Sequence, residues 1–198
     1  MTWIILGTLI VGVLTGGLLP DFVVPVLDNI TTIALCLLIF GVGVGLGRDR
    51  QILACLRAKG LSVVIIPLLI AAGSLAGTAI YALLARVAVG EAVAVGAGLG
   101  WYSLVGPLLS ELHSARLGAV AFLANSLREF ISFLIIPIVA KRFGAWSAIA
   151  PSAAAAMDVT LPLIARETDP ETAVMAFVSG TVLSLLVPLI LPLIVSLI

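Results

Sequence analysis

Charged residues are scarce in this sequence. Only 10% of its 198 residues are Asp, Glu, Lys or Arg, and the ten basic residues balance the ten acidic ones. An ordinary soluble domain carries about 25% charged residues, so this composition excludes that class. The chain also has no basic cluster that would bind a nucleic acid. We therefore expect no nucleic-acid partner.

Cysteine and histidine are almost absent. Cys36 and Cys55 have neither metal-ligand spacing nor a disulfide framework around them, and the single histidine, His113, is expected in a solvated loop. No polar stretch is long enough to form a catalytic domain outside a membrane. We expect a protein that is not an enzyme and has no metal site and no cofactor, apart from a coupling ion.

Apolar residues dominate instead, with 62% hydrophobic residues and a mean hydropathy of +1.32. The apolar runs are continuous rather than alternating, which favours helices over a transmembrane barrel. The first run lacks the basic start and the cleavage pattern of a secretory signal, so it is expected to be a span. We predict an all-α integral membrane protein whose single transmembrane domain covers residues 1–198.

Five runs are predicted to be full transmembrane helices: 1–19, 30–46, 61–84, 121–140 and 172–198. The loop 48–60 holds four basic residues against one acidic residue. Because basic loops stay on the cytoplasmic side, the rule places this loop and the N-terminus in the cytoplasm. The expected location is the cytoplasmic (inner) membrane.

Two further segments are predicted to be broken or re-entrant. Residues 93–110 contain GAGLGWYSLVGPLLS, whose glycines and proline interrupt helices. Residues 145–166 contain APSAAAAMDVTLP, with an alanine-rich bend between Pro151 and Pro162 and the acid Asp158. A normal span at 93–110 would leave Lys141 and Arg142 outside, against the charge rule. We expect one hairpin from each side of the membrane, with two ordinary spans as the alternative.

A weak internal repeat supports the hairpins. Adding 55 to the residue number carries Ser103 onto Asp158, Pro107 onto Pro162 and Pro137 onto Pro192. The units, about 93–140 and 148–195, each contain a broken segment and one long helix. A unit with one net crossing is inverted relative to its copy, and inverted repeats with discontinuous segments are frequent in transporters.

The span 121–140 carries Arg128 and Glu129 at its middle. A charge there costs roughly 2.5–3.5 kcal/mol on insertion scales and usually marks a functional pathway. Helical spacing places Asn125, Arg128, Glu129 and Ser132 on one stripe. Either the two charges pair with neighbouring helices and hold the bundle together, or they form a site for a charged ligand, which we favour.

Three motifs together resemble the LysO-type lysine exporters, a bacterial and archaeal family: GWYSLVG at Gly100–Gly106, NSLRE at Asn125–Glu129 and MDVTLP at Met157–Pro162. The resemblance extends from about Phe40 onward. It implies export of lysine from the cytoplasm, and the family's two intramembrane acids match Glu129 and Asp158.

The chain departs from the family pattern at Val105 and Pro107, where smaller or more polar residues are expected, and at the alanine-rich 152–156. Many members are longer, with an additional N-terminal membrane region. We expect a short form that acts alone, as a homodimer, or with a small membrane partner subunit.

The resemblance suggests a substrate site. Arg128 is expected to meet the carboxylate of L-lysine, and Glu129 and Asp158 its ammonium groups. The hydrogen-bonding candidates are Asn125, Ser103, Tyr102 and Thr160. With lysine bound, the ionised site sums to zero charge, which matters where unpaired charge is costly. For Tyr102 and its neighbour Trp101, burial or interface anchoring is an equal alternative.

Exchange of lysine for H⁺ or Na⁺ is the expected mode of transport, with analogues such as thialysine as further substrates. The alternatives are an H⁺ or Na⁺ channel or ion-exchange subunit with no organic substrate, and a purely structural membrane subunit. Arg128 argues against the channel because a fixed positive charge repels cations.

Overall fold

The computed structural model describes residues 62–198 continuously and, before them, only positions 11, 14, 15, 26, 30, 33, 37 and 40. The predicted spans 1–19 and 30–46 and the basic loop 48–60 fall outside the continuous part, so their prediction stands as it is. Within the described residues the secondary structure is helical, and these residues contain no strand.

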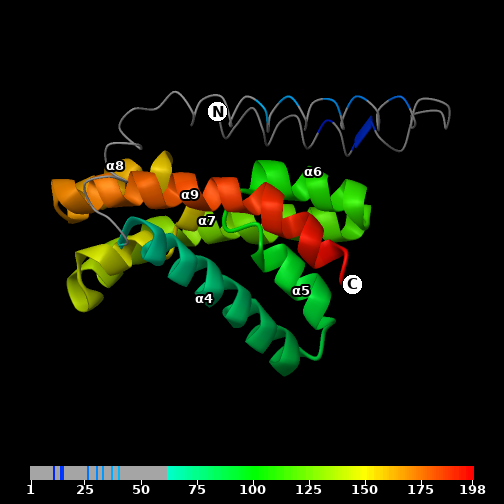
Figure 1. Ribbon diagram of the computed structural model, residues 1–198, viewed down its shortest axis with the longest axis horizontal. Helices are drawn as coiled ribbons and strands as arrows, with labels where there is room; N and C mark the ends of the chain where they lie inside the picture. The colour runs from blue at the N-terminus through cyan, green and yellow to red at the C-terminus, as the bar shows by residue number, and fades with distance from the viewer. Residues whose placement is uncertain are drawn as a thin grey trace.

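Three described helices are long and apolar enough to cross a membrane. They are α4 (Ser62–Ala85), α7 (Ala115–Phe143) and α9 (Pro170–Val195). Each coincides with one of the predicted spans 61–84, 121–140 and 172–198, with ends displaced by a few residues. In Figure 1, α7 and α9 run along the long axis of the molecule, and α4 is inclined to them.

The two longest helices begin at polar residues that cap them. At α7, the Ser114 hydroxyl accepts the Leu117 N–H at 3.3 Å, and at α9 the Asp169 carboxylate accepts the Thr172 N–H at 2.9 Å. Such caps satisfy N–H groups that have no acceptor within the helix. The hydrogen bonds from Thr172 also lower the pKa of Asp169 below its ordinary value.

The first broken segment consists of α5 (Val89–Gly96), a turn, and α6 (Tyr102–Leu112). Glu91 near the start of α5 and Arg116 at the start of α7 line one surface cavity, whereas the end of α5 reaches Asn125, midway along α7. Helix α6 then leads back to the start of α7. The two arms therefore form a hairpin beside one half of α7.

The second broken segment lies beside the other half of α7. It consists of two 3₁₀ turns, η1 (Ala145–Ile149) and η2 (Ala153–Met157), followed by α8 (Leu161–Glu167). It leaves the C-terminal end of α7, reaches Arg128 at its middle turn and returns to the start of α9. The two hairpins thus approach the middle of α7 from opposite ends.

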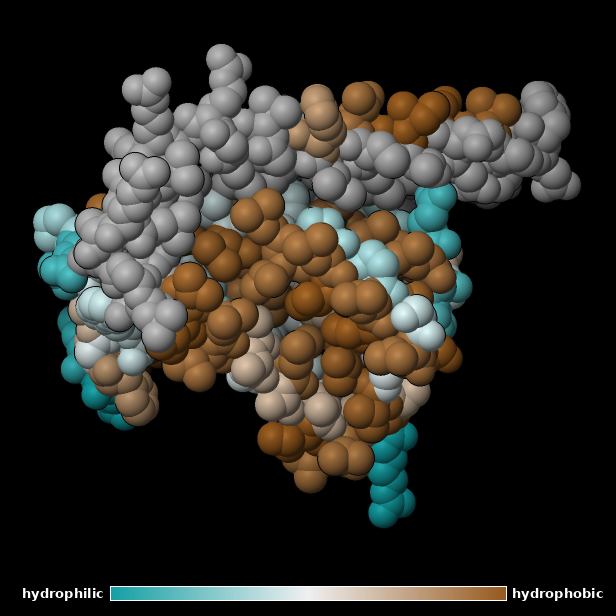
Figure 2. Space-filling view, in the orientation of Figure 1, coloured by the Kyte–Doolittle hydropathy of each residue, from teal (hydrophilic) through white to brown (hydrophobic). Residues whose placement is uncertain are grey.

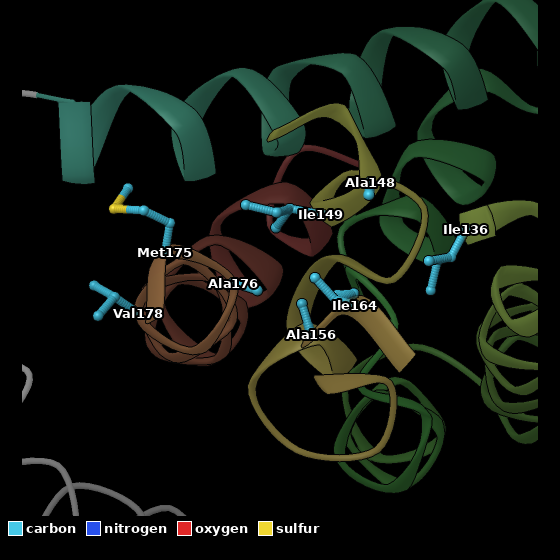
Figure 3. Close-up of a cluster of buried hydrophobic side chains, with 8 residues drawn as sticks. All are labelled: Ile136, Ala148, Ile149, Ala156, Ile164, Met175, Ala176 and Val178. Carbon is cyan, nitrogen blue, oxygen red and sulfur yellow. The ribbon is translucent and has the colours of Figure 1, made fainter. Parts of the chain in front are cut away.

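A buried apolar cluster fixes the second hairpin (Figure 3). Ile136 of α7, Ile149 of η1 and Ile164 of α8 are fully buried, together with Met175 and Val178 of α9. Among lipids, which are as apolar as leucine, close van der Waals packing rather than removal from water holds helices together. This packing fixes the broken segment between α7 and α9.

The outer surface of the described helices is apolar. Figure 2 shows hydrophobic residues over most of the visible face and hydrophilic ones toward its ends. Large side chains such as Leu123, Leu134 and Leu189 are exposed on α7 and α9. An exposed apolar surface of this extent is expected to face a membrane interior.

Candidate functional site

The two broken segments cross at the middle of the molecule. The Ala154 N–H donates to the Leu99 carbonyl at 3.0 Å. Gly100 has a φ of +92°, and a Cβ atom at this position would lie 2.9 Å from the Ser152 carbonyl oxygen. Any other residue would therefore be strained and would push the segments apart.

A cavity of about 100 Å³ opens beside this crossing. Four elements contribute to its wall: the start of α6, the middle of α7, η2 with the residues after it, and α9. The lining residues are Gly100, Trp101, Tyr102, Ser103, Glu129, Ala154, Ala155, Met157, Asp158, Val159 and Ser184. They include two carboxylates and no basic side chain.

The two carboxylates come from different elements, one from α7 and the other from the second broken segment. Glu129 projects from the continuous helix α7 and is partly buried. Asp158 follows η2, where the chain is not helical, and its Oδ1 accepts the Val159 N–H at 2.6 Å. The crossing thus brings together at one cavity two acids that lie 29 positions apart in sequence, 158 minus 129.

The start of α6 supplies the opposite wall. Tyr102 and Ser103 form its first turn and line the cavity. The Tyr102 ring contacts Phe122 edge to face, with ring centroids 5.5 Å apart. Because the first N–H groups of a helix lack acceptors inside it, this end of α6 carries partial positive charge toward the cavity.

Asn125 does not line this cavity. Its Oδ1 accepts the Gly100 N–H at 2.8 Å, and its Nδ2 donates to the carbonyls of Val95 at 3.0 Å and Ala121 at 2.9 Å. The amide is therefore occupied by the backbone of the first hairpin. It shapes the turn that precedes Tyr102 rather than facing a ligand.

Arg128 is also directed away from the cavity. Its Nε donates to the Pro151 carbonyl at 2.9 Å and its Nη2 to the Ala150 carbonyl at 3.2 Å. Its Nη1 donates to the Ser74 hydroxyl of α4 at 2.9 Å. Within the described residues no carboxylate lies within 4.0 Å of this guanidinium. Arg128 thus binds backbone carbonyls and a hydroxyl outside the cavity, whereas the two acids line the cavity.

Thr160 is buried, and its hydroxyl donates to the Ala155 carbonyl at 3.0 Å. It satisfies the broken backbone locally, the alternative use of a hydroxyl at membrane depth. Of the seven residues proposed from sequence, four line the cavity: Glu129, Asp158, Tyr102 and Ser103. The other three, Asn125, Arg128 and Thr160, bind backbone groups.

Met157 and Ser184 are among the lining residues that the sequence reasoning missed. Ser184 of α9 lies 55 positions after Glu129, and Met157 lies 55 positions after Tyr102. In the structure the Ser184 hydroxyl is 3.6 Å from the Met157 sulfur. The internal repeat held the signal, because applying its shift to the first-unit candidates identifies both residues.

Comparisons with known proteins identify the family of the chain that carries this site. A model of the family described as "Lysine exporter LysO" matches residues 6–195. The chain belongs to the lysine exporter LysO family. This confirms the resemblance seen in the three motifs, and the family is one of transporters rather than of enzymes.

Two relatives are similar over most of the chain. The lysine exporter LysO of Escherichia coli is 34% identical over 159 residues, which are 79% of this chain and 52% of the relative. A Haemophilus influenzae protein whose name assigns it provisionally to the lysine exporters is 31% identical over 94% of both chains. The chain thus spans about half the length of the first relative. No solved structure matches it.

Family membership and the apolar helices together define a multi-pass membrane protein. The crossing with its two acids therefore lies within a multi-pass membrane protein of this family. Charged groups in that position are costly and are typically retained for ion or substrate pathways.

Proposed function

We propose that this protein exports L-lysine from the cytoplasm through the cavity at the crossing, in exchange for H⁺ or Na⁺. The observation that carries the proposal is the cavity lined by Glu129 and Asp158 without a basic side chain. A cation is the ligand complementary to such a site, and the family is one of lysine exporters. The protein would lie in the cytoplasmic membrane with a cytoplasmic N-terminus.

The cavity size suggests how lysine would bind. At about 100 Å³ it is smaller than the roughly 300–1,000 Å³ of sites that enclose a drug-sized ligand. It would accept one end of lysine, with an ammonium group between the carboxylates. The α-carboxylate would face the first turn of α6 and the Ser103 hydroxyl, since helix N-termini bind anionic substrate groups in transporters.

Charge conservation in the cavity suggests the coupling. Replacing one bound lysine of charge +1 by one H⁺ or Na⁺ leaves the local charge unchanged, whether or not Arg128 is counted. Moving one positive charge outward against an inside-negative potential costs about 2.3 kcal/mol per 100 mV. A one-for-one exchange removes that cost. We propose this stoichiometry and expect thialysine to compete with lysine.

A cation channel is the second candidate, and one observation favours it. The argument against a channel was the positive charge of Arg128 in the path, but Arg128 does not line the cavity. A path lined by two acids would also admit H⁺ or Na⁺ alone. Saturability separates these functions, because a carrier saturates with its substrate.

The test is lysine counterflow in proteoliposomes. The purified protein is expected to accumulate labelled L-lysine against unlabelled internal lysine, with saturation and with competition by thialysine. The Glu129→Gln, Asp158→Asn double variant is the matched control without acids. Cation conduction with no saturable lysine flux would reject export and establish the channel.

A further inference from the structure

Helix α7 binds both crossing segments with side chains one turn apart. Asn125 holds the first segment through the Gly100 N–H at 2.8 Å. Arg128 holds the second through the carbonyls of Ala150 and Pro151 at 3.2 and 2.9 Å. The next residue, Glu129, lines the cavity between these segments. The polar side chains of this α7 stripe thus contact the first hairpin, the second hairpin and the cavity in turn.

Helix α9 offers no such polar anchors at the corresponding positions. Adding 55 to 125 and to 128 gives Gly180 and Leu183. A Cβ atom on Gly180 would lie 2.5 Å from the Met157 backbone nitrogen, and Leu183 is fully buried among apolar residues. At these two positions α9 contacts the second segment by close packing alone. The polar contacts of α9 with that segment are those of Thr181 and Ser184 with the Met157 sulfur, whereas its backbone carbonyls at 150 and 151 are bound from α7.

We propose that Arg128 is a positioning residue for lysine transport. Its guanidinium holds the segment that leads to Asp158 in place against Glu129 and does not bind the lysine carboxylate. The proposal rests on the transport function proposed above. Because Ala150 and Pro151 are consecutive, their two carbonyls are adjacent acceptors between the turns η1 and η2, a few residues before the crossing at Ala154.

The chemistry of arginine suits this role. Its planar guanidinium offers five N–H groups in a fixed fork, whereas lysine offers a single point charge. Two of these groups bind consecutive carbonyls and a third binds Ser74 on α4. Backbone that is not helical at membrane depth must find such partners. Removing the fork would free the segment carrying Asp158 and so disturb the cation site at a distance.

A pair of ligands distinguishes positioning from substrate binding. Cadaverine is lysine without its carboxylate, so it has no group for Arg128 to bind. We expect Arg128→Gln to weaken the binding of lysine and cadaverine by the same factor, about tenfold, from the loss of charge-assisted hydrogen bonds. Arg128→Lys is expected to restore part of both. Arg116→Gln, at an exposed arginine of the same helix, is the control and should bind both ligands normally.

A loss confined to lysine, with cadaverine binding intact, would overturn the proposal and assign Arg128 to the substrate carboxylate. Should the unaltered protein bind neither ligand, the proposed lysine transport fails instead. Arg128 is then judged by a measurement that needs no ligand.

That measurement is the reactivity of a thiol at Ala155, a buried residue of η2 that lines the cavity. In a background without Cys36 and Cys55, Ala155→Cys should react several-fold faster with a thiol reagent when Arg128→Gln is added. Glu111→Cys, remote from the crossing, should react at an unchanged rate. An unchanged rate at position 155 would reject positioning, and equal acceleration at both positions would reveal general unfolding and likewise reject it.

Discussion

Glu129 and Asp158 share one cavity but differ in how the chain supports them. Glu129 is held by a continuous helix whose neighbouring side chains Asn125 and Arg128 are bound to backbone. Asp158 follows a 3₁₀ turn and accepts a hydrogen bond from the next backbone N–H. A carboxylate on a continuous helix and a carboxylate on a non-helical segment are suited to different tasks.

Neutralising Glu129 and neutralising Asp158 should therefore impair different steps of lysine transport. If Asp158 binds an ammonium group of lysine, Asp158→Asn weakens lysine binding even without a gradient. If Glu129 carries the coupling proton, Glu129→Gln mimics its protonated form and abolishes net export while some lysine binding and exchange persist. Binding and counterflow by the purified variants across pH measure both effects. An equal loss of binding in the two variants contradicts this division, and normal export by either removes that acid from the mechanism.

At this scale the sequence predicted which residues are polar at depth but not what each one binds. Helical spacing placed Asn125, Arg128 and Glu129 on one stripe. In the structure the first binds the first hairpin, the second binds the second hairpin, and the third lines the cavity. The carbonyls bound by Arg128 belong to residues 150 and 151, in a segment whose path no local pattern of α7 reveals. A carbonyl acceptor leaves no mark in the sequence, because every residue has one.

Among the elements, α9 and the second hairpin approach each other closely at Gly180. Gly180 faces the Met157 nitrogen and the Ala154 carbonyl oxygen, which would lie 2.5 and 2.7 Å from an added Cβ atom. Since these are backbone atoms, they cannot turn aside as a flexible side chain can. The whole of η2 would have to move.

We expect Gly180→Ala to destabilise the protein by about 1–3 kcal/mol, the usual range for overpacking, and to impair lysine transport. Thermal unfolding of the purified variant in detergent, together with counterflow, measures both. The matched control is Gly73→Ala in α4, where a Cβ atom meets nothing within 4 Å. Stability and transport in Gly180→Ala equal to those of the control would show that η2 yields freely.

Long apolar runs made α4, α7 and α9 predictable, because hydropathy over some twenty residues identifies a span. The broken segments were recognisable from Gly and Pro, but their internal form was not. An alanine run has the highest helix propensity, yet Ala153–Met157 forms a 3₁₀ turn with Ala153 at a φ of +49°. Packing against α9 overrides that propensity.

For the whole molecule, the opposed hairpins predict which side of the membrane each end of α7 faces. The loop after α6 and the end of α7 lie at opposite ends of a helix of 29 residues, about 43 Å at 1.5 Å per residue. That length exceeds the roughly 30 Å of a bilayer core. We therefore expect the two ends to face different compartments.

Single cysteines should report this arrangement in intact cells. In a background without Cys36 and Cys55, Glu111→Cys is expected to react with a membrane-impermeant thiol reagent from outside. Lys141→Cys is expected to react only after the membrane is opened, because basic residues remain cytoplasmic. Labelling of both from outside would contradict the hairpin at 93–110, and the reverse pattern would invert the orientation.

The hydrogen bond at the crossing joins Ala154 to Leu99, and 154 minus 99 is 55, the shift of the internal repeat. Each partner is thus the counterpart of the other. If the two units exchanged conformations, the two residues would meet again with the direction reversed, and the Leu99 N–H would donate to the Ala154 carbonyl. The exchange would replace one hydrogen bond by its reverse between the same two residues, so the crossing would remain the pivot of both arrangements.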